Sequence, residues 1–379
     1  MSEMNQRALL QMLLIAPVYC AIIGLSFASP VSGFSDDFET DMGWSRFEEI
    51  VGGSSCYGDA LGGVSRTTEV AFSGSQSLLI WANQQRSNKS NHVIGQKKVA
   101  ASGQGGRWLY TVYAYIDPAT GQTGQTGPEV SVQNTRRINN QFLTATAGVQ
   151  YLPQEGTWNI WMAGWQYFLT KALIPGHWYY IAIEVDYDSN QYHRFWLWRE
   201  GEIDLSIDLT GYNIALEDKQ FTEEALWLTV ESENLWNNCG TAGVFQYRVY
   251  YDSVRLVMGP APTLYLNQAQ FQRGDNFSLR VAVTPGPTPI TADVYIALQP
   301  PGCTSFACIF FWQGGLNFTA TPQPLLRNWL ISPFNGPIFT YTFGGTEPVG
   351  GYIWLGAFVV PGTGTLMGGI TQAPFTFSP

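Results

Sequence analysis

The stretch WYYIAIEVDYDSNQYHRFWLWREG, residues 178–201, decides the fold class because it reads as two alternating runs around a polar turn. In its first run Ile181 and Ile183 share one face, and in the second run Phe195 and Leu197 do. Successive side chains of a strand point to opposite faces, so the pattern predicts a β-hairpin. One face of this hairpin is aliphatic, and the other mixes aromatic rings with carboxylates and a guanidinium.

Alternating runs of the same kind recur along the chain, separated by turns rich in Gly and Pro. The gaps between them are too short for helical crossovers, so we expect antiparallel sheets and an all-β protein. A length of 379 residues suits two domains. We place the first at 29–258, a linker at 259–263 and a smaller β-sandwich at 264–379.

Charged residues make up only 13% of the chain, and their formal net charge is −10 at pH 7. Such a surface, without a stripe of Lys or Arg, repels nucleic acid and anionic lipid, so we expect neither as a partner. Charged residues are rare in the second domain. A weakly charged β domain is expected to pack against something, which predicts self-association through it.

The first 28 residues read as a secretory signal peptide. An apolar stretch follows Arg7, and the small residues Ser26 and Ala28 suit a cleavage site that leaves Ser29 as the mature start. A retained membrane anchor is the alternative, because the stretch is close to spanning length. Cleavage is favoured and predicts a secreted, extracellular or cell-surface protein with no membrane span.

Removal of the leader leaves four cysteines, an even number that suggests disulfides in an exported chain. They are Cys56, Cys239, Cys303 and Cys308. Three pairings are open, and free buried thiols are a further alternative. The domain division favours Cys56–Cys239 and Cys303–Cys308, because each pair then stays within one domain.

Three motifs carry a resemblance to a known family. DDFE at 36–39 opens the first domain, YYDSVRL at 250–256 closes it, and FWLWREGE at 195–202 ends the central hairpin. Together they resemble concanavalin A-like jelly rolls, namely the laminin-G-like and carbohydrate-binding modules of exported bacterial proteins. The resemblance implies a two-sheet antiparallel jelly-roll sandwich. The segment from 263 to 286 resembles immunoglobulin-like end domains of such proteins.

This resemblance also implies a structural Ca²⁺ that ties the opening acidic motif to the last strand. The matching positions are Asp37, Glu39 and Asp252. Carboxylates suit Ca²⁺, but six or more oxygens are needed, so solvated acidic side chains are an equal alternative. We expect no other cofactor.

The mixed face of the hairpin predicts a glycan-binding surface, because aromatic rings can stack on sugar rings while charged groups bond to hydroxyls. ALWLTVES at 225–232 carries a similar face opposite its aliphatic one and would extend the patch if it lay in the same sheet. The predicted ligand-binding residues are Trp178, Tyr180, Glu184, Arg194, Trp196, Trp198, Trp227 and Glu231. Burial of these rings under other parts of the protein is the alternative.

The other aromatic stretch, TWNIWMAGWQYF at 157–168, is apolar on both faces and predicts a single strand that is mostly core.

Catalysis was tested against the paired carboxylates of glycoside hydrolases. EIDLSID at 202–208 offers Glu202 and Asp204, but Ser206 stands where the third acid belongs. The histidines lie near no serine or cysteine motif for nucleophilic catalysis. No catalytic residue is therefore predicted, and the chain is not expected to be an enzyme.

The leading functional hypothesis is an exported, non-catalytic carbohydrate-binding protein whose partner is a glycan or polysaccharide. A structural subunit of a surface layer, sheath or filament is the main alternative, since interfaces between permanent subunits are depleted in charge. A glycoside hydrolase or lyase comes third.

Overall fold

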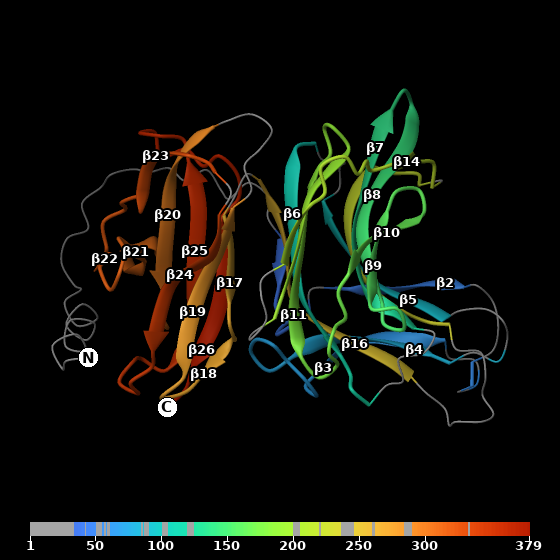
Figure 1. The fold of residues 1–379 in the computed structure, drawn as a ribbon, viewed down its shortest axis with the longest axis horizontal. Helices are drawn as coiled ribbons and strands as arrows, with labels where there is room; N and C mark the ends of the chain where they lie inside the picture. The colour runs from blue at the N-terminus through green and yellow to red at the C-terminus, as the bar shows by residue number, and fades with distance from the viewer. Residues whose placement is uncertain are drawn as a thin grey trace. The chain divides into compact units, whose positions relative to one another are not determined.

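The computed structural model describes most of the chain after the expected leader (Figure 1). It covers residues 34–379 except 42, 51–54, 57, 59–60, 85, 87–90, 101–104, 120–124, 200–204, 220, 236–245, 260–261, 284–289 and 333, and it leaves out the side chains of 46–50. The predicted signal peptide at 1–28 and the mature start at Ser29 lie outside the described residues. So do Glu202, Asp204 and Cys239.

The chain divides into two compact units, Phe34–Leu256 and, in its described part, Val257–Pro379. Strands make up nearly all of the regular structure, which confirms the all-β prediction. The helical element among the described residues is one 3₁₀ turn, Phe306–Cys308. In the part of the chain that the structure describes, no helix is long and apolar enough to cross a membrane.

The first unit is a sandwich of two antiparallel sheets, a jelly-roll-like arrangement. Sheet 1 contains the predicted hairpin. Its order is β13 (Leu205–Asp208), β12 (Gln191–Trp198), β11 (Trp178–Asp186), β6 (Arg107–Ile116), β16 (Gln246–Met258), β4 (Ser77–Asn83) and β3 (Gly62–Thr67), and β1 (Phe34–Asp36) pairs with β16.

Sheet 2 packs against the inward face of sheet 1. Its order is β10 (Trp165–Thr170), β9 (Thr157–Trp161), β8 (Gln141–Leu152), β7 (Gln125–Ile138), β15 (Ala225–Asn234), β5 (Asn91–Ala100) and β2 (Ser45–Ile50), and β14 (Leu216–Glu217) pairs with β8. The strands β7 and β15 therefore lie in its interior.

The core between the two sheets is built from the alternate residues of their strands, as the sequence pattern predicts. Ile181 and Ile183 of β11 are fully buried, and so are Leu228 and Val230 of β15. Burial of branched aliphatic side chains at about 25 cal/mol per Å² supplies the main favourable term for the sandwich.

Tyrosine hydroxyls from sheet 1 cross this core and bond to the backbone of sheet 2. Tyr110 donates to the carbonyl of Thr229 at 3.1 Å, and Tyr187 donates to the carbonyl of Val132 at 3.0 Å. Tyr251 donates to the carbonyl of Glu231 at 2.5 Å. A buried hydroxyl needs a partner, so these bonds fix how sheet 2 lies on sheet 1.

The stretch 157–168 is a hairpin, β9 and β10, and the prediction of one strand that is mostly core is wrong. Ala163 and Gly164 adopt φ values of 59° and 153°, which reverse the chain between the two tryptophans that flank them. Trp158 on the inward face is fully buried, whereas the opposite face carries rings that are partly exposed. A hairpin at the sheet edge has one covered face, and its second apolar face is left for another use.

The second unit also consists of two sheets. Sheet 3 has the order β17 (Thr263–Leu266), β19 (Asn276–Val283) and β24 (Phe334–Thr342). Sheet 4 has the order β18 (Gln270–Phe271), β26 (Thr371–Phe377), β25 (Gly350–Val359), β20 (Thr291–Gln299), β21 (Phe310–Trp312) and β22 (Phe318–Thr319), and β23 (Leu326–Leu330) pairs with β20.

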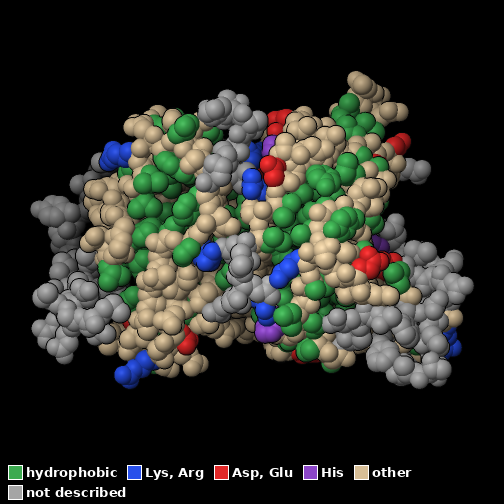
Figure 2. Space-filling view, in the orientation of Figure 1, with side chains coloured by type: hydrophobic (Ala, Val, Ile, Leu, Met, Phe, Trp, Pro, Cys, Tyr) green, Lys and Arg blue, Asp and Glu red, His purple; other side chains and the backbone are tan. Residues whose placement is uncertain are grey.

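Aromatic residues dominate the core of this unit, with Phe277, Trp354 and Phe375 buried between the sheets. On the face that Figure 2 shows, its charged side chains are scattered singly among hydrophobic and uncharged polar ones. The immunoglobulin-like assignment and self-association through this unit stay predictions.

The disulfide Cys303–Cys308 is confirmed, with an S–S distance of 2.09 Å and a Cα–Cα distance of 5.6 Å. Cys56 is also disulfide-bonded. Its expected partner lies outside the described residues, so that pairing stays a prediction.

Candidate functional site

The outward face of sheet 2 carries a row of polar side chains that the strand register brings into line. Glu231 of β15 pairs with Glu129 of β7, which pairs with Gln150 of β8. Gln150 pairs with Asn159 of β9, and Asn159 pairs with Tyr167 of β10. We call these five residues the cross-strand row. Their sequence neighbours Val230, Val130, Val149 and Ile160 are core residues, so the row points away from sheet 1.

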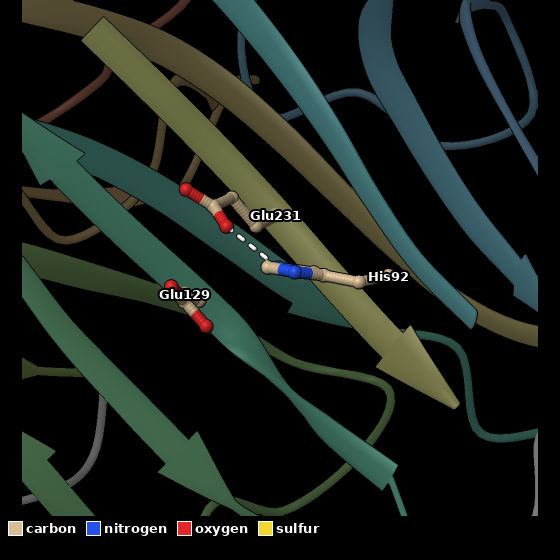
Figure 3. Close-up of side chains that lie close together, drawn as sticks. All are labelled: His92, Glu129 and Glu231. Atoms are coloured by element: carbon tan, nitrogen blue, oxygen red, sulfur yellow. Dashed lines mark ion pairs between the residues drawn. The ribbon is translucent and has the colours of Figure 1, made fainter. Parts of the chain in front are cut away.

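Two carboxyl groups and an imidazole meet at the centre of the sheet (Figure 3). The possible ligand atoms of His92, Glu129 and Glu231 all lie within 4.8 Å of one another. His92 comes from β5, and its Nε2 lies 2.7 Å from Oε2 of Glu231. We call these three residues the acid cluster. Among the described residues, no other group of three or more His, Cys, Asp or Glu side chains lies close enough together to hold one ion.

Neighbouring polar groups hold each carboxyl group in place. Gln150 Nε2 donates to Oε2 of Glu129 at 2.8 Å. The hydroxyl of Thr229 donates to Oε1 of Glu231 at 2.6 Å and lies 2.6 Å from the hydroxyl of Ser131. The partners all lie on the outward face of β7, β8 and β15, so the alternation of these strands builds the network.

The two carboxyl groups differ in protonation. Burial raises the pKa of Glu129 well above its ordinary value, and the nearby charge of Glu231 raises it further. Burial acts on the pKa of Glu231 in the same direction, but hydrogen bonds from His92, Thr229 and Glu129 outweigh it, and the pKa lies below its ordinary value. Glu129 and Glu231 are only 6% and 3% exposed. These opposite directions favour a protonated Glu129 next to an ionised Glu231.

Partly exposed aromatic rings lie at the β9–β10 edge of the same face. The ring centroids of Trp161 and Trp165 are 5.2 Å apart in an edge-to-face contact. Tyr167 ends the cross-strand row and is 61% exposed. We call Trp161, Trp165 and Tyr167 the aromatic platform. On the other side of the row, Trp227 of β15 is half-buried beneath the ammonium group of Lys98, which lies 5.7 Å from the ring centroid.

Tyr192 of sheet 1 fixes the position of this platform. Its hydroxyl accepts a hydrogen bond from the N–H of Gly148 at 2.9 Å and donates to the carbonyl of Trp161 at 2.8 Å. The hydroxyl thus takes the place of a direct bond between β8 and β9. Burial raises the pKa of Tyr192, so this group stays a neutral donor.

The eight predicted ligand-binding residues do not form one surface. Six of them lie on β11 and β12 of sheet 1: Trp178, Tyr180, Glu184, Arg194, Trp196 and Trp198. The other two, Trp227 and Glu231, lie on β15 of sheet 2. The condition for a single patch, that these strands share a sheet, is therefore not met.

The hairpin face of sheet 1 is also closed. Tyr180, Glu184, Trp196 and Trp198 are buried, while Trp178 and Arg194 are half-buried. Glu184 forms an ion pair with Arg107 at 2.6 Å, and Tyr180 packs edge-to-face on Tyr113. Among the described residues, the rings and charges of this face are bound by one another, so they form a packed layer and not a row of free ligand-binding groups.

The three predicted calcium ligands are not gathered either. Asp252 is fully buried and accepts hydrogen bonds from the N–H groups of Phe72 and Ser73 at 2.7 and 2.9 Å. Burial raises the pKa of Asp252 to about 7. Glu39 binds the N–H groups of Ser75 and Gln76, while Asp37 is exposed. Backbone donors thus hold the first two acids where the resemblance implied a cation, and Ca²⁺ binding stays a prediction.

Two members of the acid cluster escaped prediction from the sequence. His92 lies on β5, whose NHVIGQKKVA sequence has too little alternation to predict a strand. Glu129 stands at the start of a recognised strand, but only the register with β15 shows that it faces Glu231. The segment 202–208, whose acids were compared with the paired carboxylates of glycoside hydrolases, includes Asp208. This residue is exposed and binds the N–H of Thr210.

The second unit offers pockets without comparable chemistry. One is a cavity of about 80 Å³ lined almost entirely by apolar side chains, including Phe277, Phe339 and Trp354. Its one carboxylate, Glu347, is occupied by the hydroxyl of Tyr341 and by the N–H groups of Gly344 and Gly345. The acid cluster of the first unit therefore remains the candidate site.

Comparison with known proteins gives likeness in structure alone. No family model matches the chain, and no curated protein does. Among solved structures, the endo-β-1,4-glucuronan lyase of the fungus Trichoderma reesei is 15% identical with a TM-score of 0.39, over 59% of this chain and 94% of that one. The catalytic domain of a glycoside hydrolase family 131 protein from Coprinopsis cinerea is 12% identical with a TM-score of 0.31, over 49% and 71%.

A third structure, a protein of unknown function from Shewanella oneidensis MR-1, is 13% identical with a TM-score of 0.34, over 67% of this chain and 95% of that one. At such identities no residue role passes from these proteins to this chain. The similar structures include polysaccharide lyases and glycoside hydrolases. Two predictions are corrected against this finding: the assignment as a non-catalytic carbohydrate-binding protein or structural subunit, and the statement that the chain is not an enzyme. The likeness itself concerns the fold and gives this chain no activity.

Proposed function

We propose that the unit Phe34–Leu256 is a carbohydrate-active enzyme of an exported protein that hydrolyses glycosidic bonds at the acid cluster. The observation that carries this proposal is the pair of Glu129 and Glu231 on adjacent strands of one sheet face, with His92 beside them. Burial raises the pKa of Glu129, while hydrogen bonds lower the pKa of Glu231. Two carboxyl groups whose environments drive their pKa values apart provide an acid and a nucleophile in one site.

In the proposed reaction Glu129 gives its proton to the glycosidic oxygen while the bond from that oxygen to the anomeric carbon breaks. Glu231 attacks the anomeric carbon and forms a covalent glycosyl ester. Water then attacks this ester, Glu129 takes up a proton from the water, and Glu231 leaves as a carboxylate. The ligand atoms of the cluster lie within 4.8 Å of one another, which is nearer to the about 5–5.5 Å between the carboxyl groups of retaining enzymes than to the about 6.5–9.5 Å of inverting ones.

His92 supports Glu231 in this scheme and does not replace it. Its Nε2 lies 2.7 Å from Oε2 of Glu231, while Oε1 is bound by the hydroxyl of Thr229. Both bonds stabilise the carboxylate form, so Glu231 stays ionised at pH values where Glu129 keeps its proton. The residue is a positioning group that keeps the two carboxyl groups in different states.

Hydrolysis is favoured over β-elimination by the charge of the site. A lyase must stabilise the carboxylate of a uronate residue, which requires cations or neutral donors close to it. Here an ionised glutamate lies at the centre and repels a second carboxylate, at about 1 kcal/mol for 4 Å in water and more where water is excluded. The proposal therefore names uncharged glycans as substrates.

The test is cleavage of a panel of polysaccharides, followed by the release of reducing ends. The panel contains lichenan, xylan and galactomannan as neutral chains and alginate as a charged one. We expect wild type to cleave a neutral chain and Glu129→Gln and Glu231→Gln each to lose about 10²–10⁴-fold in rate, the usual contribution of an acid or base group.

Glu155→Gln, at an exposed turn of the same unit, is the control and should keep wild-type activity. The proposal fails if wild type cleaves none of the panel, or if both cluster variants retain the wild-type rate. Release of unsaturated ends from alginate would indicate elimination in place of hydrolysis.

A further inference from the structure

The acid cluster lies in the middle of sheet 2 and not at an edge. Glu129 and Glu231 stand on β7 and β15, with β8, β9 and β10 on one side and β5 and β2 on the other. The cross-strand row runs from this centre to the β10 edge. Four strand spacings of about 4.8 Å make it roughly 19 Å long, a length over which several linked sugar rings extend.

Features along this direction suit an extended chain. Gly148 lies next to Ser131 on the outward face and carries no side chain, because the Cβ of Ser131 takes up the space and lies 2.8 Å from where a Cβ of Gly148 would stand. Its neighbour along β8 on the same face, Thr146, is buried, and its hydroxyl has no hydrogen-bond partner among the described residues. The aromatic platform follows at the far end, with Tyr167 mostly exposed.

The two lysines near the cross-strand row are paired with acids, whereas the guanidinium of Arg137, at the far end of β7, donates to Oδ1 of Asn140. Lys219 lies 5.5 Å from the ring centroid of Trp161, and its ammonium is 3.8 Å from Oε2 of Glu217. Lys98 forms an ion pair with Glu223 at 2.8 Å. Neither lysine is left to neutralise a charged sugar beside the row, so this part of the face fits a chain without carboxylates.

From this arrangement we propose that an extended, uncharged polysaccharide lies across the strands of sheet 2, with sugar rings stacked on the aromatic platform, and that it is cut internally at the acid cluster. The inference rests on the proposed hydrolysis and adds to it the direction of the chain, a distal binding site and the class of substrate. Aromatic rings bind the apolar faces of sugars, and the platform lies three strands away from Glu129, so its contacts are made by sugars distant from the cleaved bond.

We call the proposed path of the polysaccharide, from the acid cluster to the aromatic platform, the binding track. A binding experiment tests this track without catalysis. The Glu231→Gln variant is run through native gels that contain lichenan, xylan, galactomannan or alginate, with Trp165→Ala and Tyr167→Ala added singly and together. We expect retardation by a neutral chain, with Kd raised roughly three- to tenfold by each substitution, and no retardation by alginate. Phe334→Ala, an exposed ring in the second unit, is the matched control and should not change the Kd.

A kinetic experiment then separates the track from the chemistry. On the same neutral polymer, the platform variants should lose roughly three- to tenfold in kcat/KM, while on a short aryl glycoside they should equal wild type. Wild type should lower the viscosity of the polymer early, before many reducing ends appear.

The two proposals fail in different ways. Binding that is unaffected by the platform variants, or an equal loss on long and short substrates, overturns the track even if cleavage by Glu129 and Glu231 holds. If the platform substitutions weaken binding but wild type cleaves no polymer, the proposed hydrolysis is refuted and the proposed binding track is supported. Retardation by alginate alone overturns the assignment to uncharged chains.

Discussion

The outward faces of the two sheets in the first unit carry similar residue types but differ in what those residues contact. On sheet 1, Phe72 stacks on Tyr113 at 3.6 Å, Tyr113 packs on Tyr180, and Arg107 pairs with Glu184. On sheet 2, the carboxyl groups contact each other and His92. Aromatic and charged side chains on one strand face therefore do not reveal by themselves whether that face is closed or available.

The difference follows from where opposite charges and rings lie in the sheet. On sheet 1 the register places a guanidinium beside the carboxylate and a ring beside a ring, so each group is satisfied internally. On sheet 2 the register places two acids side by side, which is unfavourable unless one of them holds a proton. Such an arrangement is retained where the acids have a task, which makes it a functional candidate.

The largest expected effect concerns the pH dependence of activity. The dyad should give a bell-shaped profile of kcat/KM: activity rises with pH as Glu231 ionises, below its ordinary pKa of 4.5, and falls as Glu129 loses its proton, well above 4.5. Beyond each limb the rate should fall about tenfold per pH unit. Steady-state kinetics from pH 3 to 10 measure the profile.

The variant His92→Ala sharpens this test. It removes a donor that lowers the pKa of Glu231, so the acid limb should move to higher pH. A flat profile, or an acid limb that stays in place in the variant, would contradict the assignment of Glu231 as the ionised partner.

The second prediction compares two tyrosines on the two outward faces. Tyr180→Ala on sheet 1 should lower the free energy of unfolding by about 3–5 kcal/mol, because a large ring that is 3% exposed is replaced by a cavity. Tyr167→Ala on sheet 2 should change it by about 0.5 kcal/mol or less, since its ring is 61% exposed. Urea unfolding measures both. Equal losses would show that the two faces are covered alike.

The smallest expected effect concerns the tyrosine that joins the sheets beneath the platform. Tyr192→Phe leaves the N–H of Gly148 and the carbonyl of Trp161 without their partner, at a cost of about 1–3 kcal/mol. The tryptophan fluorescence of the platform should shift as β9 loosens. The control is Tyr167→Phe, which removes an exposed hydroxyl bonded to Thr170 and should cost at most about 0.5 kcal/mol.

Much of the fold follows from local patterns. Alternation in 178–201 and 225–232 predicts strands with a buried aliphatic face, and both are confirmed. Alternation fails at 157–168, where a tight turn at Ala163 and Gly164 makes two strands out of one predicted strand. A period of two residues does not reveal such a turn when apolar residues continue on both sides of it. The pattern therefore predicts that the residues of the aromatic platform belong to the core.

The sequence by itself determined the all-β class and the faces of the central hairpin, because both depend on residues that are close along the chain. It favoured the Cys303–Cys308 disulfide among three pairings, and the structure confirms that bond. Only the tertiary structure decided the acid cluster. Its members His92, Glu129 and Glu231 come from three strands far apart in sequence, and strand register alone places them together. Side-chain pairing across strands is set by which strands are neighbours in the sheet, and that order is a property of the whole fold.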